Sequence, residues 1–186
     1  MSKKIKYIVN HCTATPPSVN DNYDIYSLMR AHLGPKRLDD GTYRYKGRNY
    51  KTIMDLPDEK IGNVHIRRIR GRGWKVPGYY ALVLTNGAIQ YTFENDMDDT
   101  VDPWEITNGA RGFNLEAVHI CYVGGIDEDG SPKDTRTAAQ KRSLLVLNQI
   151  LKRIAPQAQI IGHRDLPGVA KACPSFDAKK EYAKIQ

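Results

Sequence analysis

The residues best suited to chemistry in this sequence are His163 and Cys173, which lie near the carboxyl-terminal end, and His11, which lies far upstream. Imidazole nitrogens and a thiolate are common zinc ligands, and a site with three protein ligands keeps its fourth tetrahedral position open. A zinc ion with an open position activates water and polarises a carbonyl group. These residues therefore predict a hydrolytic zinc site.

Both histidines are expected at strand ends. The apolar run over residues 5–10 is typical of a buried strand, and His11 follows it directly. A short strand is expected over residues 159–162, immediately before His163. Two ligands of the predicted site would therefore be held by a rigid sheet.

The rest of the chain alternates strand and helix patterns, which indicates an α/β fold. Strands are expected over residues 117–123 and in a hairpin formed by residues 78–84 and 88–93 across an Asn86-Gly87 turn. A helix is expected after Asp21 or Asn22, and another over residues 137–154, where Thr137 and Gln140 have capping-box spacing.

Composition favours one domain over residues 1–186, because this length with 40% hydrophobic residues supports one core. The sequence contains no apolar run long enough to indicate a signal peptide or a membrane span. Three cysteines cannot all pair, so we interpret them as reduced thiols, with Cys12 and Cys121 as small buried residues. These patterns predict synthesis in the cytoplasm.

The net charge of +7 is concentrated in one region, since residues 35–75 contain twelve Lys and Arg against five Asp and Glu. A hairpin with the basic tip Lys46-Gly47-Arg48 is expected there, followed by a basic strand over residues 64–70. Such a field attracts nucleic acid, anionic membranes and cell-envelope polymers alike, and it also suits a plain solvated surface.

Six groups of residues, in order along the chain, carry a family resemblance: His11-Cys12-Thr13-Ala14-Thr15; Gly73-Trp74 with Gly78-Tyr79; Asn86-Gly87-Ala88-Ile89; Asn114 with Val123-Gly124-Gly125-Ile126-Asp127; Gln140; and the run from His163 to Asp177. Together they resemble the N-acetylmuramoyl-L-alanine amidases of the phage-lysozyme type, a family that includes the peptidoglycan recognition proteins. The match covers most of the chain outside about residues 35–72.

The resemblance implies a single domain with a central mixed sheet flanked by helices, a Zn²⁺ cofactor, and hydrolysis of the amide between the lactyl group of N-acetylmuramic acid and L-alanine. It implies His11, His163 and Cys173 as zinc ligands. It further implies Tyr79 and Lys171 as catalytic residues, which would orient water or stabilise the oxyanion of the tetrahedral intermediate.

The sequence departs from the family pattern in three places. Tyr80 and Gly109 stand where some members have histidine, and the segment over residues 35–72 separates the first helix from Gly73 unusually widely. We interpret this segment as an inserted basic hairpin region. Our hypothesis is that it borders the cleft and attracts polyanionic polymers of the cell envelope.

Three other functions remain open on the sequence alone. One is a peptidoglycan-binding protein without catalysis, and another is a polymerase-regulating protein of the same fold. A third is a thiol peptidase that cuts the stem peptide with Cys173 or Cys12 as nucleophile.

Some candidate residues have no assigned role in the predicted site. His32, His65 and His119 have no evident second ligand nearby, and Arg164 and Asp165 suit either support of His163 or a local helix-cap or salt-bridge role.

The expected partner is peptidoglycan, and we expect a monomer. Because peptidoglycan lies outside the cytoplasmic membrane, a chain without a signal peptide would reach it through a holin, a secretion machine or lysis. The simplest interpretation is an endolysin of a phage or prophage.

Overall fold

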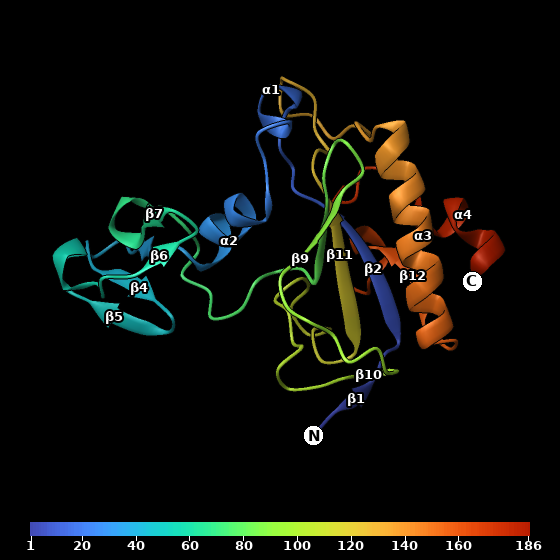
Figure 1. The fold of residues 1–186 in the computed structure, drawn as a ribbon, viewed down its shortest axis with the longest axis horizontal. Helices are drawn as coiled ribbons and strands as arrows, with labels where there is room; N and C mark the ends of the chain where they lie inside the picture. Colours follow the sequence, from blue (N-terminus) through green and yellow to red (C-terminus); the bar gives the residue numbers. More distant parts are fainter.

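A computed structural model describes residues 1–186, and a five-stranded sheet forms its centre (Figure 1). The strand order is β12-β2-β11-β8-β9, in which the first four strands are parallel and β9 is antiparallel to β8. The strands are β2 (Tyr7–Cys12), β8 (Ala81–Val83), β9 (Ile89–Tyr91), β11 (Ala117–Tyr122) and β12 (Gln159–Gly162). The predicted α/β domain with a mixed sheet is confirmed, as is the hairpin across Asn86-Gly87.

Helix α3 (Ala138–Ile154) covers one face of the sheet (Figure 1). Alternate strand residues such as Ile8 and Ile120 pack with Leu144 and Leu147 in the main core. The predicted capping box is present, because Thr137 and Gln140 exchange hydrogen bonds of 3.1 and 3.0 Å. Helix α3 therefore begins where the sequence predicts.

Buried amides fix α3 to the strand ends. The Gln140 side chain donates to the backbone carbonyls of Val83 and Val123, at 3.1 and 2.9 Å. Asn148 and Asn10 exchange two amide hydrogen bonds of 3.0 Å. These contacts hold the carboxyl ends of β8, β11 and β2 in register.

Helix α2 (Ile25–Leu33) packs against the opposite face, where Leu28 contacts a cluster that includes Leu82 and Cys121. Its N-cap is Asp24, whose carboxylate accepts from the Ser27 backbone N–H at 2.7 Å. The predicted cap at Asp21 or Asn22 was therefore wrong. Asp21 instead accepts a hydrogen bond from the Thr85 hydroxyl at 2.9 Å.

Residues 35–72, which we call the basic lobe, lie beyond α2 on the side away from α3 (Figure 1). They form a three-stranded antiparallel sheet and a small hairpin: β3 (Lys36–Arg37), β4 (Tyr43–Tyr45) and β5 (Arg48–Tyr50), then β6 (Lys60–Ile61) and β7 (Val64–His65). The β4–β5 hairpin was predicted, and its turn has Lys46 and Gly47 at φ 47° and 77°. The lobe has its own apolar cluster: Tyr45, Leu56, Ile61, Ile66 and Ile69.

The basic strand predicted over residues 64–70 was wrong beyond His65. A 3₁₀ helix, Ile66–Arg68, follows β7. Side chains three residues apart lie on the same side of a 3₁₀ helix. This geometry explains why Ile66 and Ile69 are both buried although their spacing does not fit a strand.

The remaining elements are short. β1 (Lys3–Lys4) pairs with β10 (Thr100–Val101), and two single-turn helices are present, α1 (Pro17–Asn20) and α4 (Ala178–Glu181). Further 3₁₀ helices occupy Ile53–Asp55, His163–Asp165 and Ala183–Ile185. Among all the helices, none has the length and apolar character needed to cross a membrane.

Candidate metal centre and active site

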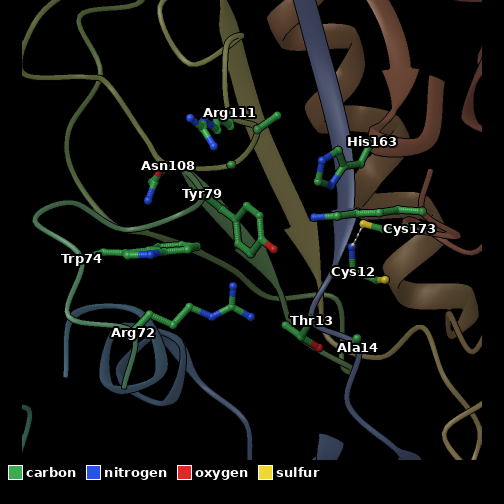
Figure 2. A pocket seen from close by; sticks show the side chains of 13 residues that line it. Cys12, Thr13, Ala14, Arg72, Trp74, Tyr79, Asn108, Arg111, His163 and Cys173 are labelled. Atoms are coloured by element: carbon green, nitrogen blue, oxygen red, sulfur yellow. Dashed lines mark hydrogen bonds between the residues drawn. The ribbon is translucent and has the colours of Figure 1, made fainter. Parts of the chain in front are cut away.

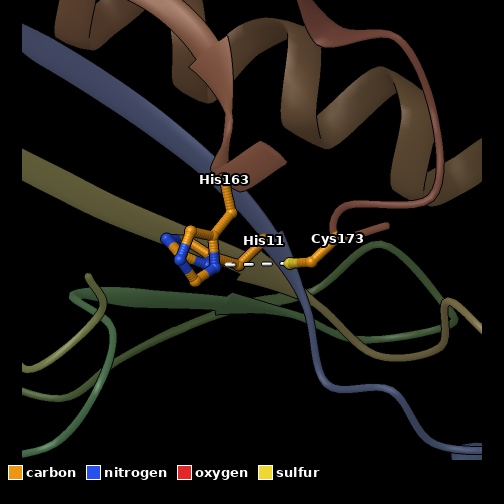
Figure 3. Close-up of side chains that lie close together, drawn as sticks. All are labelled: His11, His163 and Cys173. Carbon is orange, nitrogen blue, oxygen red and sulfur yellow. Dashed lines mark hydrogen bonds between the residues drawn. The ribbon is translucent and has the colours of Figure 1, made fainter. Parts of the chain in front are cut away.

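Three side chains from two distant parts of the chain converge at the carboxyl edge of the sheet (Figure 3). The ligand atoms of His11, His163 and Cys173 all lie within 4.8 Å of one another. His163 follows β12 as predicted, but His11 lies inside β2, because the pairing with β11 continues to Cys12. The prediction that His11 comes after the strand end was therefore wrong, because the strand ends two residues later than expected, at Cys12.

One spacing in this cluster, between His11 and Cys173, is close to that of two ligands on a tetrahedral metal ion. The His11 Nδ1 to Cys173 Sγ distance is 3.7 Å. Zinc bonds of about 2.3 Å to sulfur and about 2.0 Å to nitrogen place two tetrahedral ligands about 3.5 Å apart. Burial lowers the pKa of His163 to about 4 and holds the pKa of His11 well below its usual value, so both rings are neutral at pH 7 and keep a lone pair.

The surroundings of Cys173 keep its thiol neutral unless a cation binds beside it. Its Sγ accepts a hydrogen bond from the Cys12 backbone N–H at 3.4 Å. The neighbouring Cys12 side chain and burial raise the pKa of the Cys173 thiol, so a thiolate here needs a positive charge beside it. The donor set is therefore chemically suited to zinc.

Two contacts hold the loop between His163 and Cys173. The Arg164 backbone N–H donates to the Cys173 carbonyl at 2.9 Å. Asp165 accepts from the Gly162 backbone N–H at 2.8 Å, so it caps the short helix that carries His163. Of the roles considered for Asp165, the local cap is the one that this contact supports.

A buried arginine supports the segment after Cys173. The Arg136 guanidinium lies 3.3 Å from the centre of the Phe176 ring and pairs with Asp134 and Glu181 at 2.9 and 2.7 Å. Tyr122 donates to the Pro174 carbonyl at 2.7 Å. These contacts fix the backbone that positions Cys173.

The cluster opens into a pocket of about 350 Å³, whose lining includes Tyr79 and Lys171 (Figure 2). The rings of Tyr79 and His11 lie 4.8 Å apart. Burial raises the pKa of Tyr79 well above its usual value, so its hydroxyl stays protonated and can donate a hydrogen bond. Lys171 is exposed and close enough for its charge to lower the pKa values of His11 and His163.

The pocket is positively charged. Arg72, Arg111 and Lys171 line it, and no Asp or Glu does. Figure 2 shows Arg72 and Arg111 on either side of Tyr79. Arg72 also lies 4.9 Å from the centre of the Trp74 ring, so the last residue of the basic lobe contributes to the pocket wall.

Sequence comparison decides which family this site belongs to. The profile of the family described as N-acetylmuramoyl-L-alanine amidase matches residues 1–176. The chain belongs to this family. The predicted resemblance is thereby confirmed, and the protein is a peptidoglycan amidase.

The amidase is similar to phage endolysins along most of its length. It is 31% identical to the endolysin of Klebsiella phage KP32 over 134 residues, which are 72% of this chain and 80% of that protein. It is 32% identical to the endolysin of Escherichia phage T7 over 126 residues, which are 66% and 77% of the two chains.

Solved structures share the fold of the amidase. The N-acetylmuramoyl-L-alanine amidase LysC from Clostridium intestinale superposes with a TM-score of 0.55 at 17% identity, covering 98% of this chain and 85% of LysC. The Ph2119 endolysin of a Thermus scotoductus bacteriophage gives a TM-score of 0.53 at 21% identity, with the same coverage of both chains.

Tyr80 and Gly109, the two single residues that depart from the family pattern, lie in different parts of the amidase. Tyr80 is buried and packs against Tyr91 and Phe93, away from the pocket. Gly109 lines the pocket and leaves room for another histidine, His119, behind the cluster.

Sequence reasoning missed several residues of the site. Arg72, Trp74 and Arg111 line the pocket, although Gly73-Trp74 was used only as a family motif. His119 was left outside the site, but its Nδ1 lies 2.9 Å from the Nε2 of His11. Its position on an apolar strand was the only available signal, and such a signal does not identify a partner 108 residues away.

Proposed function

We propose that the protein is a zinc-dependent amidase that hydrolyses the bond between the lactyl group of N-acetylmuramic acid and L-alanine, with His11, His163 and Cys173 as zinc ligands. The observation that carries this proposal is the convergence of three ligand atoms within 4.8 Å beside an open pocket. Zinc at this position would supply an activated water and a Lewis acid.

Tyr79 and Lys171 complete the proposed catalytic machinery. The protonated Tyr79 hydroxyl, held beside His11, donates a hydrogen bond to the attacking water or to the oxygen of the scissile amide. The Lys171 ammonium neutralises negative charge that develops on that oxygen in the tetrahedral intermediate. The Tyr79 hydroxyl donates in its protonated form, so it needs no change of charge before the reaction.

The charge of the pocket suits the stem peptide of peptidoglycan. We propose that carboxylates of this peptide bind Arg72 and Arg111, which face the pocket on either side of Tyr79. Arginine binds carboxylates through paired hydrogen bonds, which also orient the ligand. The scissile amide would then lie between these arginines and the metal cluster.

The relatives support a proposal for the biological setting. Because the similar proteins include phage endolysins, we propose that this chain is a phage or prophage endolysin that reaches the wall through a holin, a secretion machine or lysis. One chain supplies all five proposed site residues, so we propose a monomer with a single catalytic domain.

We further propose that the basic lobe is an addition to the catalytic domain that attracts polyanionic polymers of the cell envelope. Its surface carries exposed cations such as Arg37, Arg48 and Lys51, and its last residue, Arg72, lies in the pocket wall. Such a field raises the local concentration of an anionic substrate in a salt-dependent way.

Digestion of purified peptidoglycan tests the proposed activity. Mass analysis should detect free stem peptides that begin with L-alanine, whereas released disaccharides or shortened stems would refute the proposed bond. A chelator should abolish the reaction, and added zinc should restore it.

The same assay tests the alternative function, a thiol peptidase. The observation in favour of this alternative is the 3.7 Å contact between Cys173 and His11. A thiol peptidase would survive the chelator and would lose activity on alkylation.

A further inference from the structure

His119 lies directly behind the proposed zinc ligand His11. It is on β11, its side chain is completely buried, and its Nδ1 is 2.9 Å from the Nε2 of His11. The other nitrogen of His11, Nδ1, faces Cys173. The two ring nitrogens of His11 therefore face different partners, the metal cluster on one side and His119 on the other.

This arrangement constrains where the proton of His11 lies. A neutral imidazole carries one N–H, and a nitrogen that binds a metal must have a free lone pair. If Nδ1 of His11 binds the metal, Nε2 carries the proton and requires an acceptor. The Nδ1 atom of His119 is that acceptor when the proton of His119 is on its Nε2. The opposite arrangement would put a proton on Nδ1 of His11 and block binding.

The buried position of His119 costs the protein a hydrogen bond, because its Nε2 has no partner. Buried polar groups without partners are uncommon and call for a reason beyond packing. The contact with His11 is the only side-chain hydrogen bond that His119 makes. This contact is therefore the structural feature that accounts for a histidine at position 119.

Gly109 provides the space for the His119 ring. A Cβ at position 109 would lie 2.4 Å from Cγ and 2.6 Å from Nδ1 of His119, and 2.8 Å from the Gly78 carbonyl oxygen. Such distances are too short for any side chain, so a larger residue at 109 and the observed ring of His119 exclude each other. The absence of a side chain at 109, on the pocket wall, is thus coupled to the imidazole behind His11.

We propose that His119 is a positioning residue that sets the tautomer and orientation of His11, and that Gly109 makes room for it. Metal-binding histidines usually donate their second N–H to a carboxylate, a backbone carbonyl or water. Here a second imidazole takes that place. The inference rests on the proposed metal site.

Zinc affinity, measured by competition with a chromophoric chelator, tests this role. His119→Ala should weaken zinc binding about 10- to 100-fold, the usual effect of losing such a partner. His119→Asn places an amide oxygen near the former Nδ1 and should restore affinity to within a few-fold of wild type. Gly109→Ala should displace the ring and also weaken binding about 10-fold or more.

His32→Gln is the matched control, since His32 is similarly buried and contacts Tyr79 but none of the proposed ligands. It should leave zinc affinity unchanged. Thermal unfolding of the metal-free variants separates a loss of affinity from a loss of folding, and Gly109→Ala gives an independent route if His119→Ala does not fold.

Cobalt substitution distinguishes a positioning residue from a ligand, because the visible spectrum reports the ligand set. The spectrum of His119→Asn should match that of wild type, and a changed ligand set would overturn the proposal. Unchanged affinity in His119→Ala, or equal losses in the Ala and Asn variants, would also overturn it. If the wild-type protein bound no zinc, the proposed function would fail instead.

Discussion

Polar side chains are buried at the carboxyl edge of the main sheet, whereas in the basic lobe most of them are exposed. At the sheet edge, Asn10, His11 and His119 are at most 1% exposed. In the lobe, the buried side chains are apolar or aromatic, such as Ile66 and Tyr45, and the cations lie at the surface, except for the half-buried Arg67.

This difference indicates what each region is for. Burying polar groups is costly unless they are paired, and a partly satisfied buried cluster is typical of a site that does chemistry. An apolar cluster beneath exposed charges stabilises its own fold and leaves those charges free to act at long range. We therefore expect the two regions to be separable by mutation.

The largest effect is expected from removing a proposed ligand. Cys173→Ala should lower activity on peptidoglycan by about 1,000-fold or more, because the metal contributes several kcal/mol to such reactions. The measurement is product release together with zinc content per chain. Cys121→Ala removes another buried thiol outside the cluster and should keep its zinc. Equal activity in both variants would contradict the assigned role of Cys173.

A cavity in the basic lobe should have a smaller effect and spare the site. Ile66→Ala removes a completely buried side chain from the cluster of the lobe and should destabilise that region by about 3 kcal/mol. Hydrogen exchange should rise over residues 35–72, while zinc affinity stays as in wild type. Loss of zinc binding in this variant would show that the two regions are not separable.

The stability of the junction between the main sheet and the basic lobe should depend on pH because of His32. This side chain lies on α2, accepts a hydrogen bond from the Gly78 backbone N–H at 3.1 Å and stacks on Trp74. Burial, with a smaller effect of Arg72, lowers its pKa from 6.5 to about 4. Between pH 6.5 and about pH 4, His32 is protonated in the unfolded chain but neutral in the folded chain. The folded protein therefore loses stability as the pH falls through this range.

His32→Gln should therefore reduce the loss of stability between pH 7 and about pH 4.5 by about 2 kcal/mol. Denaturant unfolding at several pH values measures it. The glutamine oxygen can still accept from Gly78, which limits the effect at pH 7. An unchanged pH dependence would exclude His32 as the source.

The smallest effect is expected from the exposed charges of the lobe. Replacing Arg37, Arg48 and Lys51 together with Gln should weaken binding to cell walls a few-fold at low salt and leave zinc content unchanged. A matched triple variant at Lys133, Arg142 and Arg153 removes the same charge from outside the lobe. If both variants lose wall binding equally, the net charge of the protein explains the binding, and the position of the charges on the lobe does not.

Much of the fold could be predicted from local patterns. The capping box at Thr137 and the turns at Asn86-Gly87 and Lys46-Gly47 depend on neighbouring residues, so they were found where expected. The cap of α2 was wrong because Asp21 is engaged by Thr85, 64 residues away. The 3₁₀ helix at Ile66 was missed because burial of Ile69 against the lobe overrides the strand pattern.

The sequence by itself determined the family, and it was enough to propose the ligand types and their order, since these depend on residue identity and spacing in one dimension. Only the tertiary structure decided that parallel pairing of β2 with β11 places His119 behind His11, and that Arg72 of the basic lobe lies in the pocket wall. These contacts join residues 108 positions apart in the first case. Such contacts depend on the register of the strands and on where the chain folds back, and no local sequence pattern encodes these features.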